Sequence, residues 1–188
     1  MGFTSACGWL ALSSVIAAAP QTATTTQRSA ANASFTYVSD DGCIQNEVVV
    51  FASRTTVVSA DPRKASVLVT YYRSRYDSCE DADLGTDLGT SSQPIFSGDL
   101  NRASLNGTVS GPTPSGLVAT ASFVLVWEGN GGITRLADRA QKTPASAKVI
   151  RSDDFRRTAV ATGTIDGHDI SGGMVSASLH TTQKTISR

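Results

Sequence analysis

The sequence predicts an all-β protein, an antiparallel β-sandwich or flattened barrel of about ten short strands. Helix-favouring Glu and Lys occur only three and four times in 188 residues, whereas Ser, Thr and Val are abundant. Apolar residues alternate with period two in several segments, and turn-forming clusters interrupt them at intervals of roughly 10 to 15 residues. Beyond residue 19, no segment keeps the 3.6-residue apolar period of an amphipathic helix.

The N-terminal segment has the features of a secretory signal peptide, which we place at residues 1–19. Residues 7–19 are mostly apolar and end in three alanines, and they are shorter than the roughly 20 residues that a membrane-spanning helix needs. No Lys or Arg precedes Arg28, so the usual positive region is missing, and a buried or frayed N-terminal helix is the alternative. Residues 20–32 are expected to be a flexible lead-in, and residues 33–188 a single β domain.

The cysteines support export. Loss of the signal peptide would remove Cys7 and leave Cys43 and Cys79, a pair separated by 36 residues. An even pair in an exported chain predicts a disulfide, which on the chain-entropy model stabilises the fold by about 4 kcal/mol. The alternative is two free buried thiols. No further Cys or His lies at ligand spacing beside either residue, so we expect no metal site there.

The clearest strand covers residues 116–128, where six apolar side chains share one face. The glycine-rich segment 129–132 follows and predicts a tight turn into a return strand over residues 133–139. Turns are also expected at Asp40-Asp41-Gly42 and Asp166-Gly167. The other expected strands cover residues 34–39, 45–52, 55–60, 65–76, 93–97, 103–109, 145–150, 157–165 and 174–181.

Several short motifs together resemble a group of exported bacterial β proteins with a DGC…YDxC cysteine pair and a WxGxG turn. They include Asp41-Gly42-Cys43, Tyr76-Asp77-Ser78-Cys79 and Trp127-Glu128-Gly129-Asn130-Gly131. The resemblance implies export and a Cys43–Cys79 pair. It implies no activity, ligand or catalytic residue.

An acidic stretch follows Cys79. Asp81, Asp83 and Asp87 fall at positions 1, 3 and 7 of a turn, a spacing similar to that of calcium loops. Position 12, where such loops carry a bidentate Glu, is Ser92. We therefore interpret the stretch as a solvated acidic loop and expect weak Ca²⁺ binding at most.

Two groups of residues could carry function. His168 lies in a predicted turn beside Asp169, with Ser171 as a conceivable nucleophile, but neighbours in one turn do not make a triad. Tyr71, Arg73 and Arg75 share one face of a predicted strand, and exposed Tyr and Arg are common at recognition surfaces. The alternative for these three is an outward sheet face without a partner.

The 16 basic and 16 acidic residues give a formal charge of zero, which argues against nucleic acid and anionic membranes as partners. The chain has no nucleotide-binding loop, nucleophile elbow or metal motif, so no cofactor is expected. We predict an exported, non-catalytic β module of a bacterial host, which either binds a protein or glycan or has a structural role, at the cell surface or outside the cell. No integral membrane segment is expected in the mature chain. The alternative is a small secreted hydrolase with a site near His168.

Overall fold

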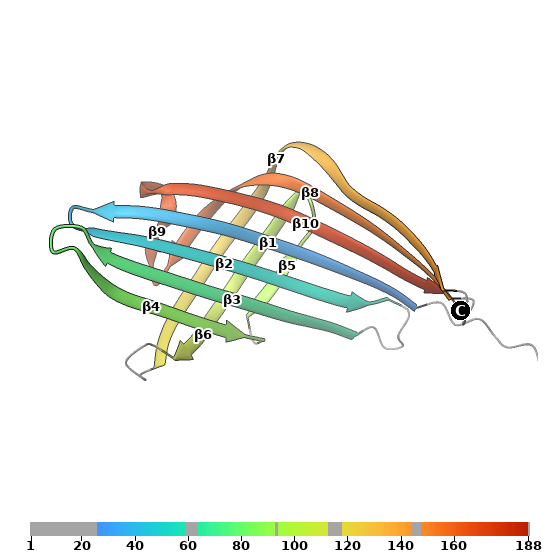
Figure 1. The fold of residues 1–188 in the computed structure, drawn as a ribbon, viewed down its shortest axis with the longest axis horizontal. Coiled ribbons are helices and arrows are strands. Elements are labelled where there is room, and N and C mark those ends of the chain that lie inside the picture. The colour runs from blue at the N-terminus through green and yellow to red at the C-terminus, as the bar shows by residue number, and fades with distance from the viewer. Residues whose placement is uncertain (1–25, 59–63, 93, 113–117, 144–147, 188) are drawn as a thin grey trace, which may run out of the picture.

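The chain folds as one antiparallel sheet of ten strands, so the predicted all-β class is confirmed (Figure 1). The structure, a computed structural model, describes residues 26–58, 64–92, 94–112, 118–143 and 148–187. The strands are β1 (Thr26–Asp41), β2 (Ile44–Val57), β3 (Lys64–Asp77), β4 (Ala82–Ser91), β5 (Ile95–Gly98), β6 (Arg102–Pro112), β7 (Val118–Thr143), β8 (Lys148–Ile165), β9 (His168–Asp169) and β10 (Met174–Ser187), with one helical turn, η1 (Ile170–Gly172). In the described part of the chain, no helix is long and apolar enough to cross a membrane.

The sheet curls so that its two halves face each other. Its order is β4-β3-β2-β1-β10-β8-β7-β6-β5, and the sheet does not close into a barrel. In Figure 1, β5, β6 and the first half of β7 cross behind the layer of β1 to β4. The core fills the space between the layers, where Trp127 packs edge-on against Phe35 at 6.1 Å and donates a hydrogen bond to the Ser34 carbonyl at 3.1 Å.

The two halves touch where β4 crosses β6. A Cβ atom on Gly111 would collide with the Leu88 carbonyl oxygen and with Gly89 of β4. Because neither glycine carries a side chain, the two backbones can approach this closely. These glycines bring the two halves into direct backbone contact.

The glycine-rich segment after Trp127 is not a hairpin turn, so that prediction was wrong. β7 continues through Gly129–Gly132 in one direction and pairs with β8 on both sides, first at Asn130 with Thr158 and then at Thr134 with Arg156. The glycines form a bulge in one long strand, and the expected return strand at 133–139 is the second half of β7. Residues 148–150 of the expected strand at 145–150 and all of the expected strand at 157–165 likewise belong to the single strand β8, and residues 145–147 lie outside the described residues.

Two other expectations need correction. The acidic stretch is not a loop, because Ala82–Ser91 forms β4 and pairs with β3. The expected flexible lead-in at 20–32 is wrong for residues 26–32, since β1 begins at Thr26 and pairs there with β10, and residues 20–25 lie outside the described residues. The predicted signal peptide lies outside the described residues.

The long strands give the sheet two different ends. The hairpin end carries the turns β1–β2, β3–β4 and β8–β9, and it comprises residues 37–48, 73–87 and 165–174. The opposite end, which we call the arm, comprises residues 26–32, 53–57, 64–68, 134–143, 148–156 and 180–187. The arm extends toward the C-terminus, beyond the crossing of β5 and β6 (Figure 1).

Candidate functional site

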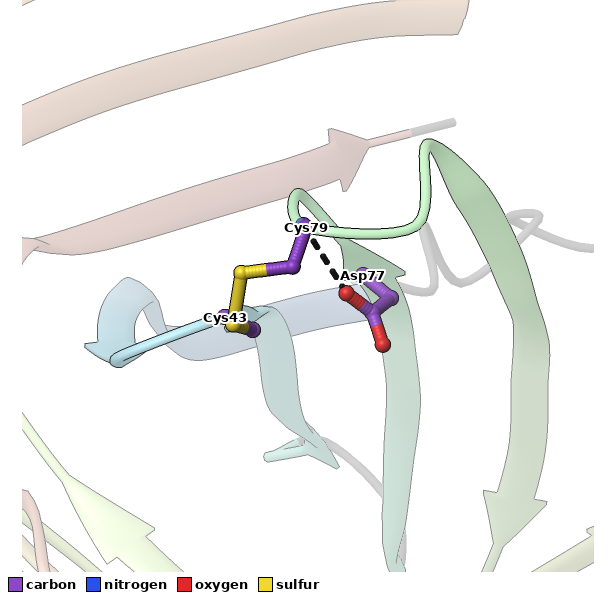
Figure 2. A group of neighbouring side chains, drawn as sticks. All are labelled: Cys43, Asp77 and Cys79. Atoms are coloured by element: carbon purple, nitrogen blue, oxygen red, sulfur yellow. Dashed lines mark hydrogen bonds between the residues drawn. A yellow bond between two sulfur atoms is a disulfide. The ribbon is translucent and has the colours of Figure 1, made fainter.

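The predicted Cys43–Cys79 disulfide is present, with the two Cα atoms 5.2 Å apart. It joins the β1–β2 hairpin to the β3–β4 hairpin, and the backbone N–H of Ser78 also donates to the Cys43 carbonyl at 2.7 Å. Asp77 lies beside the bridge and accepts a hydrogen bond from the Cys79 N–H at 2.9 Å (Figure 2). Among the described residues, these three form the one group with metal-binding spacing, but both sulfurs are in the disulfide.

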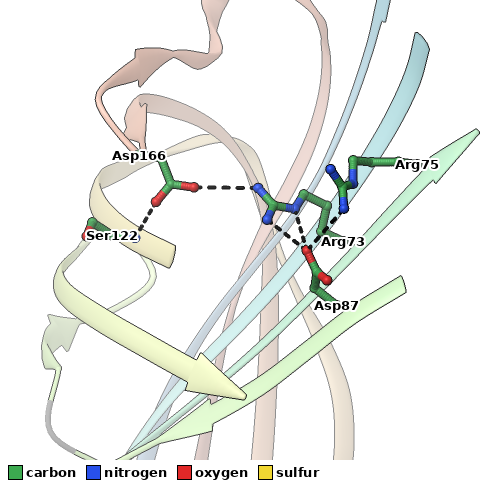
Figure 3. A network of polar contacts seen from close by, with 5 residues as sticks. All are labelled: Arg73, Arg75, Asp87, Ser122 and Asp166. Atoms are coloured by element: carbon green, nitrogen blue, oxygen red, sulfur yellow. Dashed lines mark hydrogen bonds and ion pairs between the residues drawn. The ribbon is translucent and has the colours of Figure 1, made fainter. Parts of the chain in front are cut away.

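A network of charged groups lies on the inner face of the hairpin end. Arg73 lies between two carboxylates (Figure 3). Its Nε and Nη2 atoms donate to Asp87 Oδ2 at 3.1 and 2.8 Å, and its Nη1 lies 3.6 Å from Asp166 Oδ2. Arg75 approaches the same Asp87 oxygen at 4.0 Å, and Asp166 accepts a bond from the Ser122 N–H at 2.7 Å. The network thereby joins β3 and β4 to β7 and the β8–β9 turn.

Burial governs the electrostatics of this network. Asp87 is only 4% exposed, and it is the one charged residue among the buried polar groups of the described chain. Burial also raises the pKa of the neighbouring Tyr71 hydroxyl to about 12. Burial alone would lower the pKa of the Arg73 guanidinium, but its hydrogen bonds to Asp87 and the nearby charges of Tyr71, Asp87 and Asp166 together outweigh this, and the net shift is upward. The Arg73 guanidinium therefore keeps its positive charge beside Asp87.

The Tyr71, Arg73 and Arg75 face lies inside the curl, so its interpretation as an outward sheet face was wrong. Tyr71 is buried, and its ring packs against Phe123 with 5.3 Å between the ring centroids. The Arg73 guanidinium lies over the Tyr71 ring, 5.7 Å from its centroid. Tyr71 is therefore a core residue. Arg73 and Arg75 keep partly exposed side chains.

A hollow of about 490 Å³ opens beside this network and brings the two predicted groups of residues together. Arg73, Asp166, His168 and Asp169 all line it. Asp169 Oδ1 accepts the Ser171 N–H at 2.7 Å, and hydrogen bonds from the Ser171 backbone and side chain lower the pKa of Asp169. No hydrogen bond among the described residues joins His168 to Asp169 or to Ser171, so the arrangement lacks the contacts of a Ser-His-Asp triad.

The three carboxylates considered for calcium do not converge. Asp81 accepts a hydrogen bond from the Tyr76 hydroxyl, Asp83 accepts the Gly85 N–H at 2.7 Å, and Asp87 faces inward to Arg73. They form no metal-binding cluster within the described residues. Calcium would have to displace Arg73 to reach Asp87.

Sequence reasoning missed the separation of charge between the two ends. The hairpin end contains ten Asp and Glu residues and only two Arg residues. In the arm, the side chains that the structure describes include seven Lys and Arg residues and two Asp residues. The formal charge is therefore −8 at one end and +5 at the other, from the counts just given. The composition hides this because the chain as a whole has 16 basic and 16 acidic residues and no net charge.

Comparisons with known proteins add little to this picture. No family model matches the chain, and no curated protein matches it. A solved structure from Nitrosomonas europaea, assigned provisionally as AttH, is similar over 85% of this chain with a TM-score of 0.33 and 11% identity. This chain spans 51% of the length of that one. A likeness at this level carries no functional assignment.

Proposed function

We propose that this chain is an exported, non-catalytic β module that binds a partner or glycan at the cell surface or outside the cell. The separation of charge is the observation that carries this proposal. Like charges gathered at one end of a rigid sheet weaken the fold by mutual repulsion, and they favour association with a partner of opposite charge. A disulfide between two surface hairpins suits an oxidising compartment, which supports export.

The hollow at the hairpin end supports binding better than hydrolysis. A hydrolase would need His168 held between a carboxylate and a nucleophile. Instead, Asp166 bonds to Arg73 and to the Ser122 backbone, and Asp169 bonds to Ser171. The two carboxylates next to His168 in the sequence, Asp166 and Asp169, are thus engaged in structural contacts.

The test is to pair an activity panel with a binding array, using the full secreted chain. We expect no turnover of esterase, protease or glycosidase substrates above buffer, and retention on at least one class of immobilised glycan or surface protein. Turnover that is lost in both His168→Ala and Asp169→Ala would contradict the proposal and establish the hydrolase instead.

A further inference from the structure

The outer face of the arm carries a row of positive charges. Lys184 of β10 lies directly across from Arg28 of β1, and one strand further Val57 separates Arg28 from Lys64. All three cations are exposed, and none makes an ion pair with a described residue. Like charges directly opposite each other on a sheet are destabilising, so this row has an energetic cost in the free protein.

The inner face of the same arm is built differently. There, Arg135 and Arg151 both pair with Asp153, at 2.5 and 3.6 Å. On the outer face, Asp154 is the one described carboxylate, and it forms no ion pair with the cations around it. Arg54 is an exposed inner-face cation that also forms no ion pair with a described residue, but the outer face carries four such cations, Arg28, Lys64, Arg156 and Lys184.

A separate groove lies on the outer face nearer the middle of the sheet, beginning at Asn32 and His180. Strand alternation places small polar side chains of β1, β8 and β10 on the outer face, where Ser34 and Ser178 share a hydrogen bond at 3.0 Å. The groove has a volume of about 520 Å³ and runs between Phe51 of β2 and Leu136 of β7. A neighbouring hollow of about 340 Å³ shares Ser34, Ser178 and Arg156 with it.

The groups that line the groove suit a hydroxyl-rich, acidic ligand. Arg156 is exposed there without an ion pair among the described residues. Asn32 donates to Nδ1 of His180 at 3.2 Å, which leaves the His180 Nε2–H free to donate to a ligand. Phe51 is 42% exposed and offers an aromatic face at one wall. Serine hydroxyls add further hydrogen-bonding groups.

We propose that this outer face binds an acidic polysaccharide, a chain of sugars that carries carboxylate or sulfate groups. This inference rests on the proposed binding function and names its ligand class. Four residues of β1 separate the row containing Arg28 from the row containing Arg156, a distance of about 13 Å. A polymer with repeated charges reaches both rows, whereas a single small anion does not. A hollow lined with hydroxyls also fits a sugar chain better than the flat surface of a bilayer.

The experiment measures binding of the full chain to polygalacturonate and dextran sulfate, with neutral dextran, duplex DNA and anionic vesicles alongside. We expect saturable binding to the acidic polysaccharides that weakens with salt and is absent on neutral dextran. Arg28→Gln/Lys184→Gln should weaken it by about tenfold, because two exposed ionic contacts with the ligand are lost together and each contributes modestly. Ser178→Leu should weaken it by filling the groove at unchanged charge.

Arg102→Gln is the control for Arg156→Gln, because Arg102 is an exposed cation of β6 outside the arm. Equal losses in these two variants would show that only net charge matters and would overturn the inference. So would equal binding to DNA, or binding to vesicles without binding to polysaccharide. If the chain binds an immobilised glycan or surface protein but none of the polyanions, this inference fails and the proposed binding function stands. Turnover of a hydrolase substrate would contradict both the inference and the proposed function.

Discussion

Replacing Asp87 tests whether the charged network at the hairpin end holds the fold together. Asp87→Asn preserves the side-chain volume but leaves the Arg73 guanidinium without its main counter-charge, 2.8 Å away. Breaking a buried ion pair from one side costs roughly 3 to 5 kcal/mol. We expect the lower end, about 3 kcal/mol, because the Arg73 side chain keeps 25% exposure and Asp166 remains 3.6 Å from it. For a chain of this size, the loss lowers Tm by roughly 6 to 12 °C.

The tandem repeat in β4 supplies a matched control for this measurement. Asp83 and Asp87 begin the two copies of the Asp-Leu-Gly-Thr repeat, but Asp83 is exposed and bonds only to the Gly85 N–H. Urea unfolding followed by the fluorescence of the buried Trp127 should show less than about 0.5 kcal/mol of change for Asp83→Asn. The double variant Arg73→Met/Asp87→Asn also removes the guanidinium that Asp87→Asn leaves without a counter-charge, so it should recover part of the lost free energy of unfolding. Equal effects at both positions, or a loss below 1 kcal/mol for Asp87→Asn, would refute the reasoning.

Three further outcomes are expected. Cys43→Ser should lower the free energy of unfolding by up to about 4 kcal/mol by non-reducing urea titration, and no change would show that the bridge contributes nothing. Gly111→Ala should lower the free energy of unfolding by about 1 to 3 kcal/mol, because the new Cβ collides with the Leu88 carbonyl. Gly132→Ala is the control, since a Cβ there meets open space, and it should lower the free energy of unfolding by less than about 1 kcal/mol. Equal losses would contradict the close strand crossing. The pKa of Tyr71 is raised to about 12 from the ordinary 10, because the buried hydroxyl stays protonated where the unfolded one ionises. The free energy of unfolding should therefore fall by about 3 kcal/mol between pH 10 and pH 12. If wild type and Tyr71→Phe lose the same free energy of unfolding over this pH range, the prediction is contradicted.

The core-facing residues could be predicted because alternation is a local pattern, and the disulfide because only two cysteines remain once the predicted signal peptide is removed. Alternation along residues 116–128 correctly identified Phe123, Leu125 and Trp127 as buried. The Asp166-Gly167 turn was also correct, with both residues at positive φ. The segment 129–132 misled because a glycine-rich bulge and a hairpin turn have the same composition. Pairing with β8 on both sides of the segment decides between them, and that information is not local.

The role of Asp87 could not be predicted for a related reason. In the sequence it is one of several acidic residues in a polar stretch, and its repeat partner Asp83 has the same neighbours. The β3–β4 register shifts between Arg75 and Tyr76, so Asp87 lies opposite Arg73 on the inner face, while Leu88 points outward and is 51% exposed. Burial here follows from the pairing of β4 with β3 and not from the polarity of the segment.

The two ends of the sheet are built so that stability and binding can be separated. The hairpin end contains the disulfide and the network in which Arg73 contacts both Asp87 and Asp166. The outer face of the arm has cations that form no ion pair with a described residue, so replacing Arg28 or Lys184 breaks no ion pair there and relieves the repulsion between the two. A variant that weakens binding while leaving stability equal or higher is therefore the expected behaviour of the arm. A structural surface would behave in the opposite way, because replacing its residues would lower stability first.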